Sequence, residues 1–147
     1  MPRVFLDSNI LVYTALEQDR DKTIKACQIL ADLQKDGCGC LSLQVLRELA
    51  NVLFRKGGFS AADVRTVLDG MAVFPCVTDS RTGLNRALEI KEKFGLQFYD
   101  ALILATAEAA GCDTVYSEDM GDGVMYDGIT VKDPFKETVP SDVAPSR

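Results

Sequence analysis

The sequence predicts an α/β fold in which a short, mostly parallel sheet is covered by helices on both faces. The first observation is that short, wholly apolar runs alternate with longer segments of helical periodicity. This alternation is typical of parallel strands buried between helices. The second observation is the size and composition: 147 residues, 47% hydrophobic and 26% charged, suit one globular domain with its own core.

The first half of the chain supplies two strands and three helices. A buried strand is predicted at 3–6, and a helix follows directly, with Asp7 among the residues that can cap it. Apolar residues at helical spacing predict a second helix at 20–36, which a glycine ends. A short strand at 39–42 then leads into a helical stripe over 43–56, which is followed by two glycines.

The middle of the chain continues the alternation. Ser60 has an acidic residue three positions later, a pattern typical of a helix start. The segment 73–77 is β-like, and Pro75 within it predicts an edge strand or a bulge, because proline has no amide hydrogen to donate. Ser80 can cap a further helix, which ends near Gly95.

The last third begins with the most apolar helix of the chain. Residues 100–110 are apolar on nearly every side, which predicts a helix buried against the sheet. Strands are predicted at 114–117 and 129–131, with a glycine-containing loop between them. We therefore expect a single domain over 1–135 and a weakly ordered, proline-containing tail over 136–147.

The N-terminus and the overall hydropathy predict a soluble, cytoplasmic protein. Its first apolar run is too short for a signal peptide, and no segment has the roughly 20 apolar residues that a membrane-spanning helix needs. No membrane association is expected.

The cysteine and histidine content restricts the possible chemistry. The five cysteines form neither an even set nor paired CxxC motifs, so we interpret them as reduced thiols of the core, with Cys38-Gly39-Cys40 as a weak alternative metal-binding pair. The chain has no histidine, which excludes Ser-His-Asp, Cys-His and His-metal sites. A hydrolytic site must therefore be built from oxygen atoms, which suit Mg²⁺ or Mn²⁺.

Four carboxylates occupy positions from which they could share such a site. Asp7 and Asp119 each follow a predicted strand, Asp100 stands in the first turn of the apolar helix, and Glu48 interrupts a helical stripe. In an open parallel sheet, ligands bind beyond the carboxyl ends of the strands, where the strand order reverses. Converging carboxylates would raise one another's pKa values unless cations shared the site, and two divalent ions could then bind a phosphodiester and activate water.

Taken singly, each of these acids also has an ordinary structural explanation. Asp7 is suited to capping a helix, Asp100 to complementing a helix dipole, and Asp119 to a turn. Glu48 could pair with a neighbour on a solvated helix face. Their joint occurrence favours a shared site, because one architecture would bring all four to the same edge of the sheet.

Four segments together resemble the motif regions of the PIN domain family, and of its VapC-type toxins in particular. The resemblance covers about residues 3–135, and the segments occur in the family's order. They are Val4-Phe5-Leu6-Asp7-Ser8-Asn9, Leu46-Arg47-Glu48-Leu49, Phe98-Tyr99-Asp100-Ala101-Leu102-Ile103-Leu104-Ala105 and Val115-Tyr116-Ser117-Glu118-Asp119. The resemblance implies a PIN-like α/β/α sandwich and a ribonuclease that depends on Mg²⁺ or Mn²⁺.

The resemblance also implies roles for individual residues. Asp7 and Asp100 would be the primary metal ligands, Asp119 a further ligand, and Glu48 a ligand or the group that orients the attacking water. The supporting residues would be Asn9, Ser117 and, less directly, Asp122. The family further implies a homodimer and, for a toxin, a small antitoxin protein whose tail enters the acidic pocket.

The charge distribution gives little information about the RNA substrate. A net charge of −6 and a pI near 4.6 exclude a protein that coats nucleic acid by bulk positive charge. The candidate RNA-binding clusters are Arg47/Arg55/Lys56 and Arg81/Arg86/Lys91/Lys93.

Other functional classes compete with a toxin nuclease. A receiver-like signalling module is suggested by Asp79 after a strand and by Lys132 near the C-terminus, but Asp7 lacks the acidic neighbour that a receiver needs. A phosphatase with a nucleophilic Asp is disfavoured because Asn9 stands where a second Asp is required. A catalytically inactive binding domain and a housekeeping nuclease of the same family stay open.

Overall fold

The computed structural model describes residues 2–136, in which short strands and helices alternate as predicted. The elements in chain order are β1 (Val4–Leu6), α1 (Ser8–Ala15), α2 (Arg20–Asp36), β2 (Gly39–Ser42), α3 (Leu43–Gly57), α4 (Ala61–Gly70), the 3-10 helix η1 (Met71–Val73), β3 (Cys76–Val77), α5 (Arg81–Phe94), α6 (Phe98–Ala109), β4 (Thr114–Tyr116), β5 (Met125–Tyr126) and β6 (Ile129–Lys132). All of the predicted tail except residue 136 lies outside the described residues.

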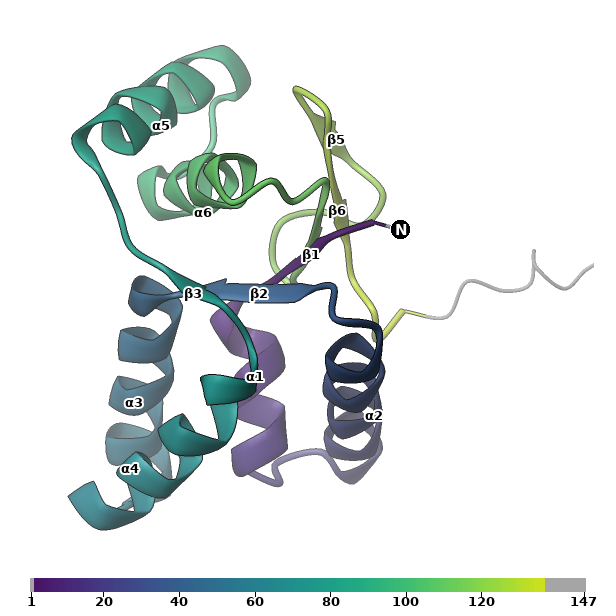
Figure 1. Cartoon of the computed structure of the whole chain (residues 1–147), viewed down its shortest axis with the longest axis vertical. Coiled ribbons are helices and arrows are strands. Elements are labelled where there is room, and N and C mark those ends of the chain that lie inside the picture. The colour runs from purple at the N-terminus through teal and green to yellow at the C-terminus, as the bar shows by residue number, and fades with distance from the viewer. Residues whose placement is uncertain (1, 137–147) are drawn as a thin grey trace, which may run out of the picture.

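The strands form one sheet in the order β3-β2-β1-β4-β6-β5. All neighbouring strands are parallel except β5, which is antiparallel to β6. Helices α5 and α6 lie above the sheet in Figure 1, and α1, α2, α3 and α4 lie below it. The predicted α/β architecture, with a mostly parallel sheet between helices, is therefore confirmed.

The sheet is built outward from β1, which is the feature that positions the site. From β1 the chain moves to β2 and β3 on one side and later returns to β4 on the other side. The order of the strands thus reverses between β1 and β4. The two strands are in register, with Leu6 opposite Tyr116, so the residues that follow each strand leave the sheet at the same place.

The core consists of the sheet and the inner faces of the helices. The largest fully buried side chains include Phe5, Leu6, Ile10, Leu11, Leu41, Leu49, Leu53, Leu104, Val115 and Val131. In α6, every residue from Ala101 to Ala107 is buried, which agrees with its continuous apolar sequence. Burial of this helix and of β1 stabilises the region from which two of the four carboxylates project.

Local capping signals define most helix starts. The side chains of Asp7, Ser42, Ser60 and Ser80 each accept a backbone N–H of the first turn of their helices. Helix α6 begins at Phe98, two residues before the expected start at residue 100. Its first helical hydrogen bond runs from Ala101 N–H to the Gln97 carbonyl (3.0 Å). The acid at position 100 therefore lies within the first turn.

Two strands differ from the prediction. The segment 73–77 forms a strand only at Cys76–Val77, at the sheet edge, and Pro75 contributes its carbonyl, which accepts from Leu41 N–H at 3.0 Å. Strand β5 was not expected. It is joined to β6 by a turn in which Asp127 and Gly128 have φ of 50° and 92°, and an Asp-Gly pair between two short apolar runs is the signal of such a hairpin.

The interpretation of all five cysteines as core residues is wrong for two of them. Cys38, Cys40 and Cys112 are buried, whereas Cys27 and Cys76 are exposed, and all five are free thiols. The buried residues of α2 are Ala26 and Leu33, so Cys27 falls outside the buried stripe. Cys76 is exposed because β3 is an edge strand.

The described helices were also compared with the requirements of a membrane span. None of those within residues 2–136 combines the necessary length and apolar character.

Candidate functional site

The candidate site begins where β1 and β4 end. Asp7 follows β1, and its backbone N–H donates to the Tyr116 carbonyl at 3.1 Å, which continues the pairing of the two strands. One carboxylate oxygen, Oδ1, accepts from the Ser8 amide (2.8 Å), and the other, Oδ2, accepts from the Ser117 hydroxyl (2.8 Å). These bonds hold the Asp7 side chain at the point where the strand order reverses. The residue is only 8% exposed.

Asn9 connects the first turn of α1 with the loop after β4. Its Nδ2 donates to Asp119 Oδ2 at 3.0 Å and to Ser117 Oγ at 3.3 Å, and its Oδ1 accepts from Glu118 N–H at 3.3 Å. Ser117 Oγ also accepts from Asp119 N–H (3.2 Å). Asn9 and Ser117 together therefore fix Asp119 beside Asp7.

The other two carboxylates approach from opposite layers of the fold. Glu48 projects from α3, below the sheet in Figure 1, and Asp100 from the first turn of α6, above it. Glu48 Oε2 accepts from Gln44 Nε2, one helical turn earlier, at 3.3 Å. The side-chain amide oxygen of Gln44, Oε1, is buried without a hydrogen-bond partner among the described residues.

All four carboxylates line one open hollow. Its volume is about 310 Å³, and its lining residues are Asp7, Ser8, Asn9, Glu48, Asn51, Val52, Arg55, Tyr99, Asp100, Ile103 and Asp119. The structure thus brings together the four acids that the sequence placed on separate elements. Two expected supporting residues lie outside the lining: Ser117 is fully buried behind Asp7, and Asp122 Oδ1 accepts from Asp133 N–H at 2.9 Å in the following loop.

The electrostatics of the hollow reflect burial first and repulsion between carboxylates second. The pKa of Asp7 is raised to about 6, chiefly because burial disfavours its charged form, and the charges of Glu48 and Asp119 add to this effect. The hydrogen bonds from Ser117 and Ser8 act in the opposite direction. The pKa of Asp100 is also raised, first by burial and then by Asp119 and Glu48. Because the charges of Glu48 and Asp119 raise the pKa values of both Asp7 and Asp100, a cation in the hollow would relieve this repulsion.

The chemistry of the side chains, rather than a finished coordination sphere, is what suits a divalent ion. The hollow offers carboxylate and amide oxygens, which are the ligands that Mg²⁺ and Mn²⁺ prefer. Within residues 2–136, no group of three or more His, Cys, Asp or Glu side chains is arranged closely enough to hold a metal ion as it stands. The lining residues thus fit such an ion in the type and charge of their donor atoms, although their side chains are not yet gathered around one point.

A cluster that sequence reasoning missed keeps Glu118 away from the hollow. Lys22 forms an ion pair with Glu118, and Tyr13 donates from its hydroxyl to Glu118 Oε1 at 2.9 Å. The Lys22 ammonium lies 5.2 Å from the ring centroid of Tyr13 and 5.5 Å from that of Phe135. These groups anchor the loop that carries Asp119. No local sequence signal links them, because 96 residues separate Lys22 from Glu118.

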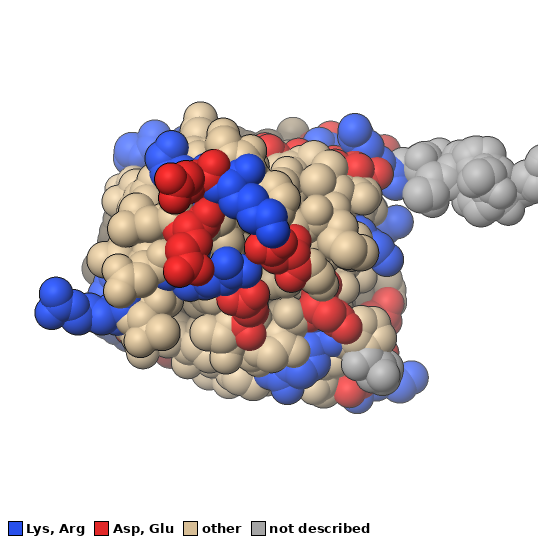
Figure 2. All heavy atoms as spheres, turned by 90° about the horizontal axis from the view of Figure 1, so that it is seen from above, with Lys and Arg blue, Asp and Glu red and all other residues tan. Residues whose placement is uncertain are grey.

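The two candidate basic clusters differ in their surroundings. Arg86 pairs with Glu89, Glu108 and Asp127, and Lys93 also pairs with Asp127. On the face that Figure 2 shows, basic and acidic side chains are intermingled, and no broad area is only basic. In the other cluster, Arg55 lines the acidic hollow, whereas Arg47 and Lys56 do not.

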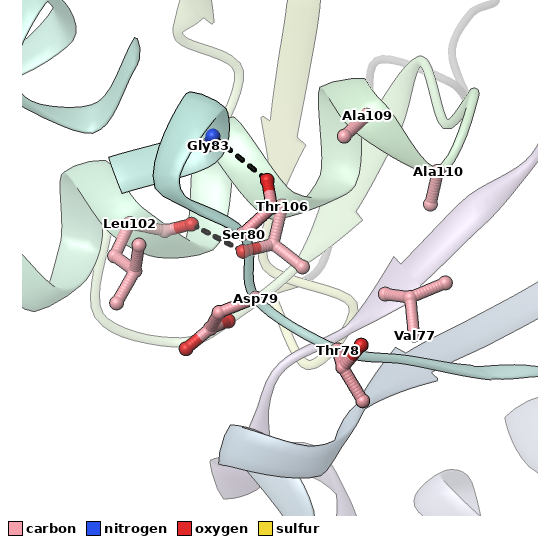
Figure 3. A pocket seen from close by; sticks show the side chains of 9 residues that line it. All are labelled: Val77, Thr78, Asp79, Ser80, Gly83, Leu102, Thr106, Ala109 and Ala110. Carbon is pink, nitrogen blue, oxygen red and sulfur yellow. Dashed lines mark hydrogen bonds between the residues drawn. The ribbon is translucent and has the colours of Figure 1, made fainter. Parts of the chain in front are cut away.

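A second hollow, drawn in Figure 3, lies between α6 and the segment that joins β3 to α5. Its volume is about 130 Å³, and Asp79 is its one charged lining residue. Two of its hydroxyls are engaged locally, since Ser80 Oγ accepts from Gly83 N–H and Thr106 donates to the Leu102 carbonyl. Asp79, which suggested a receiver-like module, therefore lies apart from Asp7.

An α/β domain with four acids at the switch point of its sheet belongs to a recognisable class of proteins. The sequence profile of the PIN domain family matches residues 4–121, and the chain therefore belongs to the PIN domain family. The resemblance of the four motif segments is thereby confirmed. A comparison with curated proteins found no match.

Solved structures with the same fold include several toxins. A toxin–antitoxin complex from Klebsiella pneumoniae is similar with a TM-score of 0.68 at 20% identity, covering 91% of this chain and 99% of that chain. VapC20 of Mycobacterium tuberculosis, a toxin that cleaves the sarcin–ricin loop, has a TM-score of 0.65 at 19% identity, covering 79% and 89%. DNA-bound VapBC from Salmonella typhimurium has a TM-score of 0.66 at 17% identity, covering 90% and 98%. At these identities, the similarity establishes the fold.

Proposed function

We propose that this protein is an endoribonuclease that depends on Mg²⁺ or Mn²⁺ and acts in the cytoplasm as the toxin of a toxin–antitoxin pair. The observation that carries the proposal is the hollow shared by Asp7, Glu48, Asp100 and Asp119 in a PIN domain. The similarity to a toxin that cleaves the sarcin–ricin loop supports RNA as the substrate. The similarity to toxin–antitoxin complexes supports a protein partner.

The four acids divide the work of holding a metal and orienting water. Asp7, Asp100 and Asp119 would be the principal ligands, and a bound divalent ion would offset the charge of the phosphodiester and make a coordinated water more acidic. Glu48 Oε2 accepts from Gln44, and Oε1 has no hydrogen bond within residues 2–136, so Oε1 could serve as a ligand or orient the attacking water.

The supporting residues set the geometry before substrate arrives. Ser117 directs the Asp7 carboxylate by donating to Oδ2, and Asn9 directs Asp119 by donating to its Oδ2. The Ser117 bond favours the ionised form of Asp7 and so opposes burial, which raises the pKa of that carboxyl. We propose that Asn9 and Ser117 act as positioning residues, whereas Asp122 stabilises the loop through Asp133.

The partner would inhibit the enzyme by neutralising the same hollow. An arginine on an antitoxin tail could replace the cation there, because its guanidinium binds carboxylates through paired hydrogen bonds. We propose that this antitoxin is a small protein encoded in the adjacent reading frame, with a DNA-binding N-terminal half and a basic or aromatic C-terminal tail. The toxin itself is proposed to be a homodimer.

Expression in cells tests the toxin proposal. Expressing the chain alone should arrest growth with cleavage of RNA, and co-expression of the neighbouring protein should restore growth. The Asp7→Asn variant should be harmless at the same expression level. Harmless expression of a folded chain that does cleave RNA would instead assign a housekeeping nuclease, and the toxin proposal would be abandoned.

A further inference from the structure

Tyr99 is an exposed aromatic side chain at the rim of the acidic hollow. It is 62% exposed, although it directly precedes Asp100 and lines the same hollow. Its ring meets that of Phe98 edge-on, with 5.1 Å between the centroids and 68° between the planes. Phe98 is half-buried against the core and so restrains the neighbouring ring. A flat aromatic surface is thus held in water beside the four acids.

Among the described residues that line this hollow, Arg55 is the one basic side chain. It stands on the same face of α3 as Glu48, since the two are separated by seven residues, or two helical turns. None of the ion pairs or side-chain hydrogen bonds found within residues 2–136 involves Arg55. Arg86, by contrast, is engaged by three acids. The donors of Arg55 therefore stay available to a ligand.

We propose that Tyr99 and Arg55 form a binding site for single-stranded RNA, in which an unpaired base stacks on the Tyr99 ring and a neighbouring phosphate binds Arg55. This inference rests on the proposed ribonuclease function and assigns two residues to the binding of its substrate. Stacking on an aromatic ring is available to every base, but only when that base is not already stacked inside a duplex.

The overall charge of the chain makes such local contacts necessary. With a net charge of −6, bulk electrostatics oppose the approach of RNA. The ion pairs of Arg86 and Lys93 further reduce the free positive charge on the α5 side. Stacking does not depend on charge, so Tyr99 would supply affinity that the surface potential does not.

Binding of a fluorescein-labelled, single-stranded RNA octamer, measured by fluorescence anisotropy, tests the proposal. The full chain should carry Asp7→Asn and be assayed in Mg²⁺, so that the RNA stays intact. Tyr99→Ala should weaken binding about tenfold or more, whereas Tyr99→Phe should keep affinity within about twofold. Leu88→Ala removes another exposed apolar side chain, 50% exposed on α5, and should have no effect.

Salt dependence separates the two contacts. Arg55→Gln should reduce the slope of log affinity against log salt by about 0.7, the value for one phosphate of a single strand, and Tyr99→Ala should leave that slope unchanged. A blunt duplex of the same sequence should bind more weakly than the single strand. Far-UV circular dichroism and thermal melting of each variant would exclude loss of the fold as the cause.

Three results would overturn the inference: unchanged affinity in Tyr99→Ala, equal loss in Tyr99→Phe, or equal binding of the duplex. Where the first result is accompanied by loss of antitoxin binding, Tyr99 belongs to a protein contact instead. Tyr99-dependent binding without any RNA cleavage would instead leave this site standing and refute the proposed ribonuclease activity. RNA cleavage together with binding that does not depend on Tyr99 would support the ribonuclease activity and refute this binding site.

Discussion

The Ser117 hydroxyl donates a hydrogen bond of 2.8 Å to Asp7 Oδ2, across 110 residues of sequence. It joins the ends of β1 and β4 at the point where the strand order reverses. Both residues are buried, so this bond is shielded from water and favours the ionised form of Asp7. A site that needs a charged carboxylate in a buried position depends on such a donor.

Replacing Ser117 with Ala should therefore move the pH dependence of cleavage. Without the hydroxyl, the pKa of Asp7 in the metal-free protein rises above its value of about 6, and the acidic limb of the activity profile, measured at subsaturating metal, should shift upward by about one pH unit. Ser117→Thr keeps the donor and serves as the control. If the two variants gave the same profile, the hydroxyl would not be what sets the ionisation of Asp7.

Asp7 should also make the metal-free protein less stable as the pH rises. Its pKa in the folded state, about 6, lies above the value of 3.8 expected for a free carboxyl, so the folded state binds the proton more tightly than the unfolded state does. The contribution is favourable below about pH 4 and is lost as the pH rises to about 6, which amounts to about 2–3 kcal/mol.

Urea denaturation in EDTA, from pH 4 to pH 7, measures this contribution. The free energy of unfolding of Asp7→Asn should gain about 2–3 kcal/mol relative to the wild type across that interval, because the amide does not titrate. A constant difference between the two proteins would mean that the pKa of Asp7 is not raised by folding.

Asp100 should couple the stability of the protein to a metal. Asp100→Asn relieves repulsion with Asp119 and Glu48, so its thermal midpoint without metal should equal or exceed that of the wild type. At Mn²⁺ concentrations about 100 times the dissociation constant, the wild type should gain about 2.7 kcal/mol, and the variant clearly less. Asp79→Asn, in the second hollow, should respond as the wild type does. Equal shifts in the wild type and Asp100→Asn would show that Asp100 is not a ligand.

The Lys22–Glu118 pair should stabilise the loop that carries Asp119. Lys22→Met, which also weakens the contacts with Tyr13 and Phe135, should lower the free energy of unfolding by about 1 kcal/mol. Combined with Glu118→Gln in a double-mutant cycle, it should reveal a coupling energy of about 0.5–1 kcal/mol. Strict additivity of the two substitutions would mean that the pair contributes no stability of its own.

The parts of the fold that depend on short-range signals were predictable from the sequence. Serine caps located the starts of α4 and α5, and closing glycines located the ends of α2, α3 and α5, nearly to the residue. Sequence periodicity was a poorer guide to which face of a helix is buried. Ile24 and Cys27 belong to the predicted apolar stripe of α2, but both are exposed. Apolar residues on more than one side of a helix leave its orientation to be decided by packing.

The candidate site was predictable in outline but not in detail. The rule that ligands bind at the switch point of a parallel sheet places Asp7 and Asp119 together once the strands are located. It does not reveal that Asn9 holds Asp119 or that Lys22 holds Glu118, because these contacts connect distant segments through side chains alone. Nor does it distinguish Arg55, which lines the hollow, from Arg47 and Lys56, which do not.

The most direct test of the central claim is RNA cleavage by the purified full chain, with and without a divalent ion. The wild type should cleave in Mg²⁺ or Mn²⁺ and be inactive in EDTA. Asp7→Asn should be folded but slower by about 100-fold or more, since even residues that only support metal ligands can cost that much. Asp79→Asn should cleave normally. Cleavage that is undiminished in EDTA, or in folded Asp7→Asn, would contradict the proposal that the four carboxylates form a metal-dependent active site.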